Sequence, residues 1–148
     1  MVEVPKGLPQ WIADHIQQYL DDPEAAHLWD ATLGGGSGKV PTLLLISKGR
    51  KTGEDRPLPL IYGQVDGGYA IIASKGGAPD HPAWYLNLKA EPSCRVHVAS
   101  AQFEAVAREA EGEERDRIWN QMVGIYAPYE DYQKATDRKI PVIVLEPR

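Results

Sequence analysis

Two short segments of this chain are almost wholly apolar: residues 40–47 (VPTLLLIS) and residues 140–145 (IPVIVL). Apolar runs of this length, without alternating polar residues, are typical of strands that are buried on both faces. The apolar fraction of 43% and the charged fraction of 25% allow an ordered core without disulfides or a metal. A chain of 148 residues is expected to form one domain, since domain size peaks near about 100–150 residues.

Further strand patterns follow the first apolar segment at short intervals. Residues 56–65 and 69–74 are joined by Asp66-Gly67-Gly68, and Asp-Gly between apolar runs predicts a hairpin because glycine accepts a positive φ. Pro57 and Pro59 have no amide hydrogen to donate, so we expect their end of the strand to lie at an edge or to be irregular.

Residues 94–98 and 103–107 alternate apolar and polar side chains and predict two more strands. Consecutive strands with short connections pair antiparallel. We therefore predict an α+β fold, a small closed or split β-barrel of about six mainly antiparallel strands with flanking helices.

Helical spacing of apolar residues covers 9–31, with a break at Asp21-Asp22-Pro23 and a second helical piece over 25–33. The glycine-rich residues 34–38 are expected to be a flexible linker. We therefore divide the chain into an N-terminal helical segment with its linker, residues 1–38, and a barrel domain, residues 39–148. Within the barrel domain we expect helices over 84–89, capped by Asp80, and over 113–126, restarting at Pro128.

The formal net charge of −5 argues against a general nucleic-acid binder. The single cysteine forms no intrachain disulfide, which is consistent with a reducing compartment. No window approaches the run of about 20 apolar residues that a membrane helix needs, and the N-terminus does not resemble a signal peptide. These features predict a cytoplasmic protein with no transmembrane segment and leave peripheral membrane contact open.

Common catalytic and metal motifs are not matched. Residues 33–40 have Leu33 and Val40 where a phosphate-binding P-loop needs glycine and Ser or Thr. The four histidines have no metal-ligand spacing, so we expect no metal site. Cys94 lies within a strand pattern and is expected to be a small buried apolar residue rather than a nucleophile.

Two basic loops follow apolar strands. The first contains Lys48, Arg50, Lys51 and Arg56, and it is positively charged in a negatively charged chain. The second is the segment 74–77 (SKGG), which leads into a helix N-terminus near residue 82. Glycine loops and helix N-termini offer free N–H groups to phosphate or carboxylate. The alternative is that both loops are solvated charged turns.

Two aromatic features accompany these loops. Trp84, Tyr85 and Asn87 lie on the short helix, while Tyr126, Tyr129 and Tyr132 recur every three residues and share one stripe on a helix. Phenol rings can form the wall of a pocket for flat substrates and offer hydroxyl groups. Both features are also compatible with ordinary core packing. The residues alone thus predict a pocket for an anion and an aromatic ring, and no further.

Four ordered motifs resemble the deazaflavin-dependent nitroreductase family: residues 49–53 (GRKTG), 56–60 (RPLPL), 74–77 (SKGG) and 82–88 (PAWYLNL). The resemblance spans roughly residues 40–145. It implies a split barrel related to the flavin-binding barrels and the use of coenzyme F420, a deazaflavin with a phosphate and an oligoglutamate tail. The anionic tail would explain a basic loop in an acidic protein.

The resemblance also implies site residues. Ser74 and Tyr129 are the candidate catalytic residues, and Tyr126, Tyr129 and Tyr132 are candidates for substrate binding. Ile61 occupies a place where the family can carry a tyrosine beside the substrate. The implied cofactor-binding residues are Arg50, Lys51, Thr52, Arg56, Pro57, Leu58, Pro59, Leu60, Ile61, Ile72, Ala73, Ser74, Lys75, Ala83, Trp84, Tyr85, Leu86, Asn87 and Tyr129.

The function implied by the resemblance is hydride transfer from reduced F420 to a small-molecule acceptor, which could be a quinone, an enone or a nitro compound. One alternative is a carrier that binds F420 without turnover, and another is an FMN-binding split barrel. The Arg50-Lys51 loop favours F420 over FMN. The protein is expected to be a monomer or a homodimer.

Overall fold

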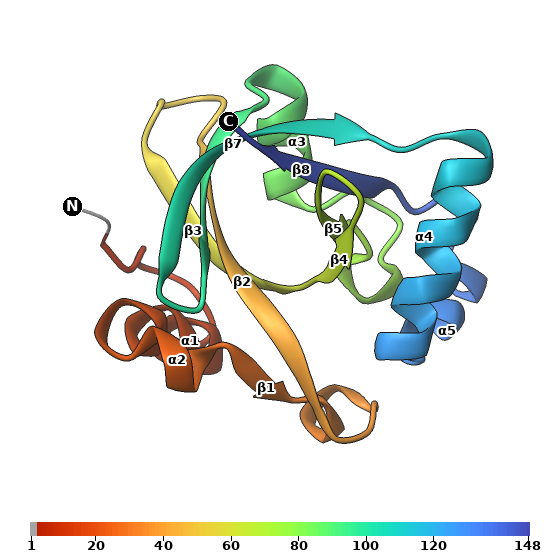
Figure 1. The fold of residues 1–148 in the computed structure, drawn as a ribbon, viewed down its shortest axis with the longest axis horizontal. Coiled ribbons are helices and arrows are strands. Elements are labelled where there is room, and N and C mark those ends of the chain that lie inside the picture. Colours follow the sequence, from red (N-terminus) through yellow and green to blue (C-terminus); the bar gives the residue numbers. More distant parts are fainter. Residues whose placement is uncertain (1–2) are drawn as a thin grey trace.

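In the computed structural model, which describes residues 3–148, one antiparallel sheet curls into a split barrel with helices on its outside (Figure 1). Its strands are β1 Leu28–Asp30, β2 Lys39–Lys48, β3 Asp55–Ile61, β4 Gly63–Val65, β5 Gly68–Ile72, β6 Ser93–Val98, β7 Ala101–Glu109 and β8 Val142–Pro147. Their order is β1-β2-β6-β7-β8-β5-β4, and β3 pairs with β2. The predicted α+β split barrel is therefore correct.

The helices are α1 Gln10–Asp21, α2 Pro23–Ala26, α3 Ala83–Ala90, α4 Gly112–Ile125 and α5 Pro128–Lys134, with short 3-10 helices η1 Ala31–Gly34 and η2 Lys75–Gly77. In Figure 1, α1 and α2 lie beside β2, while α4 and α5 lie together beside β4 and β5. The predicted helices over 84–89 and 113–126, and the restart at Pro128, agree with α3, α4 and α5.

The sheet has eight strands among the described residues, rather than about six. The single strand predicted over 56–65 is two strands, because Tyr62 separates β3 from β4 and the chain leaves its pairing with β2 there. The helix predicted over 25–33 is wrong, since residues 28–30 form β1 and pair with residues 39–41 of β2. The hairpin between β4 and β5 at Asp66-Gly67 is confirmed by the register of Val65 opposite Gly68.

Strand β2 explains the first apolar run. It pairs with β1, β3 and β6, and its side chains alternate between two cores. Leu43 and Leu45 point into the barrel interior, where they pack with α3 residues such as Trp84. Leu44 and Ile46 point outward and pack beneath α1. β2 is thus buried on both faces, as expected, because α1 covers the face that would otherwise meet water.

A third core lies between the sheet and the helices α4 and α5. Ile72 and Val142 contribute from the sheet, while Met122, Tyr126 and Tyr129 contribute from the helices. Residues of β5 and β8 alternate between this core and the barrel interior, so that the last apolar segment, residues 140–145, is also buried on both faces. The tyrosines therefore lie over one edge of the barrel.

The glycine-rich residues 34–38 form a packed turn rather than a flexible linker. The N–H of Gly36 donates to the carbonyl of Ala31, and the N–H of Ala31 donates to the carbonyl of Gly38. A Cβ added at Gly34 would lie 2.2 Å from the hydroxyl oxygen of Tyr126. Glycine is therefore required there by the close approach of a side chain, a contact that local sequence does not reveal.

Asp80 does not cap α3. Pro82 occupies the N-cap position with extended backbone, and no side chain accepts from the first turn of the helix. The prediction placed the cap two residues too early, because Pro82 was assigned to the first turn. The first N–H groups of α3 consequently have no side-chain acceptor.

Candidate active site

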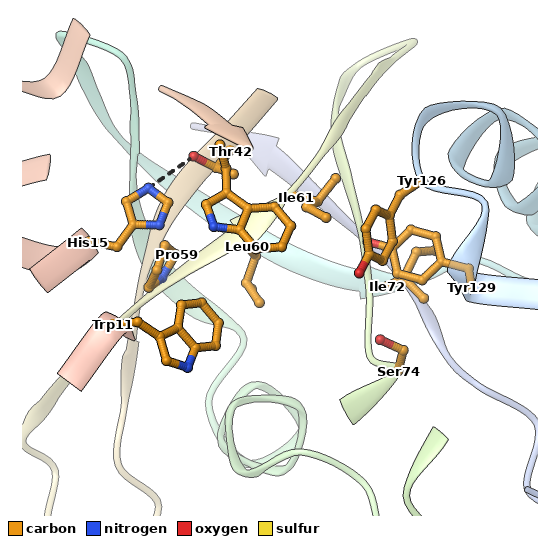
Figure 2. Close-up of a pocket in the computed structure, with 11 residues that line it drawn as sticks. Trp11, His15, Thr42, Pro59, Leu60, Ile61, Ile72, Ser74, Tyr126 and Tyr129 are labelled. Atoms are coloured by element: carbon orange, nitrogen blue, oxygen red, sulfur yellow. Dashed lines mark hydrogen bonds between the residues drawn. The ribbon is translucent and has the colours of Figure 1, made fainter. Parts of the chain in front are cut away.

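A cavity of about 160 Å³ lies between the N-terminal helix, the β3 edge and the tyrosine-bearing helices (Figure 2). Trp11 and His15 of α1 lie on one side, Tyr126 and Tyr129 on the other, and Leu60 and Ile61 of β3 between them. The residues that line the cavity are Trp11, His15, Trp29, Thr42, Pro59, Leu60, Ile61, Ile72, Ser74, Tyr126 and Tyr129.

The three tyrosines predicted to share a stripe do meet, although the stripe spans two helices. The ring centroid of Tyr126, at the end of α4, lies 5.0 Å from that of Tyr129 and 6.2 Å from that of Tyr132 on α5. Tyr126 donates its hydrogen to the carbonyl of Gly34 at 2.7 Å. Tyr132 must therefore be the donor in the 3.1 Å bond between the hydroxyls of Tyr126 and Tyr132.

Tyr129 differs from its two neighbours. Within residues 3–148, its hydroxyl has no hydrogen-bond partner, although the side chain is only 4% exposed and lines the cavity. Burial raises its pKa well above the ordinary value, and the nearby phenols of Tyr126 and Tyr132 add to this effect. Tyr129 is therefore a neutral phenol whose proton is available to a ligand.

Ser74 faces the same cavity from the end of β5 (Figure 2). Its hydroxyl also lacks a hydrogen-bond partner in the described part of the chain, and the residue is buried. Two uncommitted hydroxyl donors, from Ser74 and Tyr129, thus line an otherwise largely apolar cavity. Such a cavity suits a flat molecule with a polar oxygen, because the apolar walls contact the ring and the hydroxyls orient the oxygen.

The opposite wall comes from the N-terminal region, whose residues are not among the predicted site residues. Trp11 and Trp29 stack with ring centroids 6.2 Å apart, and Trp29 lies 6.2 Å from Tyr126. His15 Nε2 donates to the carbonyl of Ala26 at 2.9 Å, which fixes the ring beside Thr42. The sequence signal for Trp11 is the apolar helix face over residues 9–20, whereas the strand β1, which carries Trp29, has no strand pattern in the sequence.

Ile61 lines the cavity, whereas the neighbouring Tyr62 points the other way. The Tyr62 ring packs in the barrel interior and its hydroxyl shares a 2.7 Å hydrogen bond with His27 Nε2. Tyr62 therefore cannot replace a tyrosine at position 61. At this point the cavity wall is aliphatic.

Next to the cavity, residues 74–77 form a concave backbone turn. Ser74 has φ −79° and ψ −39°, and the following residues Lys75 and Gly76 have φ 47° and 62°. A right-handed residue followed by a left-handed one directs successive N–H groups to one side, a conformation that binds anions. The N–H groups of Ser74, Lys75 and Gly76 have no acceptor among the described residues.

The first basic loop is partly neutralised by its own acidic residues. Asp55 pairs with Lys48 and with Arg95, and Glu54 pairs with Arg56. Within the described chain, no carboxylate lies at ion-pair distance from Arg50 or Lys51. These two exposed cations therefore account for the available positive charge of the loop.

Asn87 connects this loop to α3. Its Oδ1 accepts hydrogen bonds from the backbone N–H and the guanidinium Nη1 of Arg50, at 3.2 and 3.0 Å. Asn87 is 4% exposed. Its amide oxygen therefore holds the loop in place and is not free for a ligand.

The predicted site residues thus fall into separate groups. Seven of them line the cavity: Pro59, Leu60, Ile61, Ile72, Ser74, Tyr126 and Tyr129. Trp84 and Tyr85 pack inside the barrel, and Tyr85 donates to Glu109. The remainder lie outside the cavity lining: Arg50, Lys51, Thr52, Arg56, Pro57, Leu58, Ala73, Lys75, Ala83, Leu86, Asn87 and Tyr132.

Comparison with known proteins identifies the family of this chain. The model of one family, described as F420H(2)-dependent quinone reductase, matches residues 22–147. The chain belongs to the F420H2-dependent quinone reductase family. The match includes β1 and the glycine turn together with the barrel, and it begins after α1.

Individual relatives extend the comparison. An F420H2-dependent quinone reductase of Mycobacterium tuberculosis is 34% identical over 95% of this chain and 99% of its own length. A solved F420H2-dependent reductase is 45% identical, with a TM-score of 0.67, over 72% of this chain and 94% of its own. Another solved structure, described as a domain-swapped dimer, is 38% identical with a TM-score of 0.68, over 93% and 98%.

The family makes F420 the cofactor of this enzyme. The residues present fit its anionic parts, because three N–H groups of residues 74–76 have no acceptor in the described chain and the turn carries the exposed Lys75. Arg50 and Lys51, on the loop between β2 and β3, add two cations that have no carboxylate partner in the described chain. No helix in the described part of this F420-dependent reductase is long and apolar enough to cross a membrane.

Proposed function

We propose that this enzyme transfers a hydride from reduced F420 to a flat quinone that binds in the cavity between Trp11 and the tyrosines. One observation carries the proposal: the uncommitted hydroxyls of Ser74 and Tyr129 face an aromatic cavity. This cavity adjoins a backbone turn whose N–H groups are free. The family match supports the quinone as acceptor.

Different groups of residues are suited to the phosphate, the oligoglutamate tail and the ring of F420. When bound, reduced F420 supplies the hydride, and the protein supplies binding, orientation and electrostatics. The N–H groups of residues 74–76 and the Lys75 ammonium hold the phosphate. Arg50 and Lys51 hold the oligoglutamate tail as exposed, salt-sensitive cations. Pro59, Leu60 and Ile61 provide an apolar edge that would contact the ring.

The acceptor needs a hydrogen-bond donor at the oxygen where negative charge develops. Tyr129 supplies one, because its phenol is neutral and has no competing partner in the described chain. Ser74 supplies a second from the end of β5. Donors aimed at a developing oxyanion in a site with little water stabilise the transition state more than the ground state. The hydride supplies one of the two hydrogens that the hydroquinone gains, and the one proton still needed passes from solvent through one of these hydroxyls, which is reprotonated in turn.

The remaining walls exclude water and select a flat ring. Trp29 and Tyr126 present aromatic faces, and Ile61 and Ile72 present aliphatic ones. Such walls favour planar apolar acceptors, as aromatic stacking contributes about 0.5–1.5 kcal/mol per pair beyond area burial. Enones and nitro compounds of similar size would have to use the same two hydroxyl donors.

The test is a fluorescence titration of the protein with F420 and, in parallel, with FMN. It is followed by anaerobic mixing of reduced F420 and enzyme with menadione, and separately with a nitroimidazole. We expect F420 to bind and to be oxidised when menadione is present. Binding without oxidation would favour the carrier, and binding of FMN alone would mean that the cofactor assignment is wrong.

Trp11, which lines the cavity, and Leu28 and Leu33 are exposed apolar residues of the N-terminal region, at 59%, 49% and 75% exposure. We propose that these residues of a cytoplasmic protein contact the membrane in which quinones dissolve. Vesicle co-sedimentation of wild type and a Leu33→Ser variant tests this contact.

We also propose that the protein forms a homodimer, because one relative is described as a domain-swapped dimer. Analytical ultracentrifugation tests this proposal.

A further inference from the structure

The backbone turn at residues 74–77 is strained. Lys75 has φ 47°, a left-handed conformation that residues other than glycine seldom adopt, and Gly76 and Gly77 follow at 62° and 83°. Gly76 and Gly77 adopt this conformation without strain, whereas Lys75 persists in it only where the surroundings enforce it. Only two backbone bonds close the turn, from Gly77 N–H to Ser74 and from Ala78 N–H to Lys75.

Arg138, in the connection between α5 and β8, supplies the rest of that constraint. Its Nε donates to the carbonyl of Ala78 at 2.9 Å, its Nη1 to Ala73 at 3.2 Å and its Nη2 to Ser74 at 2.7 Å. Nη1 also donates to Nδ1 of His81 at 3.2 Å. The guanidinium thus binds both ends of the turn through carbonyl oxygens.

Arg138 makes no ion pair among the described residues, so its donors are committed to this backbone. Its own position is fixed by α5. Gln133 donates through Nε2 to the carbonyl of Arg138 at 2.8 Å, and its Oε1 accepts from the N–H of Ile140 at 3.0 Å. Gln133 lies one helical turn after Tyr129, on the same helix.

The turn and α5 also touch directly. A Cβ added at Gly77 would lie 2.8 Å from the carbonyl oxygen of Tyr132. The helix that carries the tyrosines is therefore in contact with the turn that carries the free N–H groups. Arg138 is the side chain that joins the two by hydrogen bonds.

We infer that Arg138 is a positioning residue for the phosphate of the cofactor: by binding the carbonyls of Ala73, Ser74 and Ala78, it holds the N–H groups of residues 74–76 in their converging conformation. This inference rests on the proposed function. The guanidinium faces the carbonyl side of the turn, so it acts through the backbone and not by contact with the anion. Its positive charge also makes the turn a better anion site.

The experiment measures binding rather than turnover. The dissociation constants of F420 and of the deazaflavin core that lacks phosphate and glutamates are determined for wild type, Arg138→Gln and Arg138→Lys. We expect Arg138→Gln to weaken F420 binding about 10-fold or more, with a change under about twofold for the core. Arg138→Lys should recover little, because an ammonium cannot reproduce the planar fork.

Hydrogen exchange of the unliganded protein provides a second readout. Peptides covering residues 73–81 should exchange faster in Arg138→Gln, while peptides covering β6 and β7 should not. The matched control is Arg108→Gln, which removes an arginine that pairs with Glu114 and Glu146 elsewhere. That variant should lose stability but keep the F420 affinity.

Equal weakening of F420 and of the core in Arg138→Gln would mean a general structural role and would overturn the inference. So would unchanged F420 affinity, or unchanged exchange of residues 73–81. If Arg138→Gln does not fold, the same dissociation constants and exchange rates are measured for His81→Ala and Arg138→Lys. Wild-type protein that binds neither deazaflavin would instead overturn the proposed function.

Discussion

The hydroxyl of Tyr126 donates a hydrogen bond to the carbonyl oxygen of Gly34, 2.7 Å away and 92 residues earlier in the chain. This bond joins the end of α4 to the glycine turn before β2. It also places the Tyr126 ring beside Trp29, so the two walls of the cavity are set relative to each other. The shape of the cavity therefore depends on a contact between two segments that are 92 residues apart in the chain.

Gly34→Ala tests this dependence. The added Cβ would meet the Tyr126 hydroxyl at 2.2 Å, so the turn or the tyrosine must move. We expect a loss of about 1–3 kcal/mol in the free energy of unfolding and a higher KM for menadione. Gly124→Ala is the control, since nothing lies within 4 Å of its Cβ position in α4, and it should stabilise by up to about 1 kcal/mol.

Tyr129→Phe should lower kcat by about 100-fold, because it removes one donor from the oxygen that becomes negative. The dissociation constant of F420 should change far less. Single-turnover oxidation of reduced F420 by menadione measures the first effect, and fluorescence titration the second. Tyr132→Phe should have a smaller effect on kcat, since its hydroxyl already serves Tyr126. Equal loss of turnover and F420 affinity in Tyr129→Phe would make Tyr129 a cofactor contact instead.

Lys75→Ala should weaken F420 binding by about 1–3 kcal/mol, roughly 5- to 150-fold in Kd, if its ammonium pairs with an anion. The effect should shrink as salt is raised. Arg117→Ala, on the exposed face of α4, removes the same charge and should leave Kd nearly unchanged. A Kd for Lys75→Ala equal to that of wild type would remove Lys75 from the phosphate site.

Asn87→Asp should weaken the binding of F420 without lowering the stability of the fold. The new carboxylate would pair with the Arg50 guanidinium that now donates to the Asn87 oxygen. The loop should stay in place, while one of its two free cations is neutralised. We expect several-fold weaker binding of F420 with little loss of melting temperature. Asn87→Ala should lower both, and a tighter Kd in Asn87→Asp would contradict the assignment of the tail to this loop.

Alkaline pH should destabilise the fold through Tyr19. Burial raises its pKa to about 12, and its hydroxyl donates to the carbonyl of Thr42 at 2.8 Å. Because the folded pKa is raised, the stabilisation is complete below the unfolded value of about 10. It is lost as pH rises toward about 12, by about 2 kcal/mol. Urea unfolding at several pH values measures this, and Tyr19→Phe should flatten the alkaline decline.

The strands of the barrel could be predicted because their signals are local. The apolar run of β2, the Asp66-Gly67 turn and the alternation in β6 and β7 each occupy only a few residues. The tyrosine cluster was also accessible from spacing. The motif resemblance gave the cofactor, since four motifs in order identify a family more reliably than one.

Contacts between distant segments could not be predicted. β1 is a strand only because residues 39–41 offer it hydrogen bonds, and Gly34 is fixed only by the approach of Tyr126. Trp11 and Trp29 reach the cavity for the same reason. Arg138 follows this pattern, because its donors bind carbonyls about 60 residues away. Nothing in its local sequence distinguishes it from a surface arginine.

Cys94 has a consequence for the lifetime of the enzyme. Quinones are electrophiles that alkylate thiolates, so an enzyme that handles them risks inactivating itself. This chain has one cysteine, whose side chain packs inside the barrel and donates to the carbonyl of Ala105. Burial raises its pKa to about 11, so little thiolate forms and the sulfur is shielded. The protein can therefore meet reactive acceptors without offering them a nucleophilic thiol.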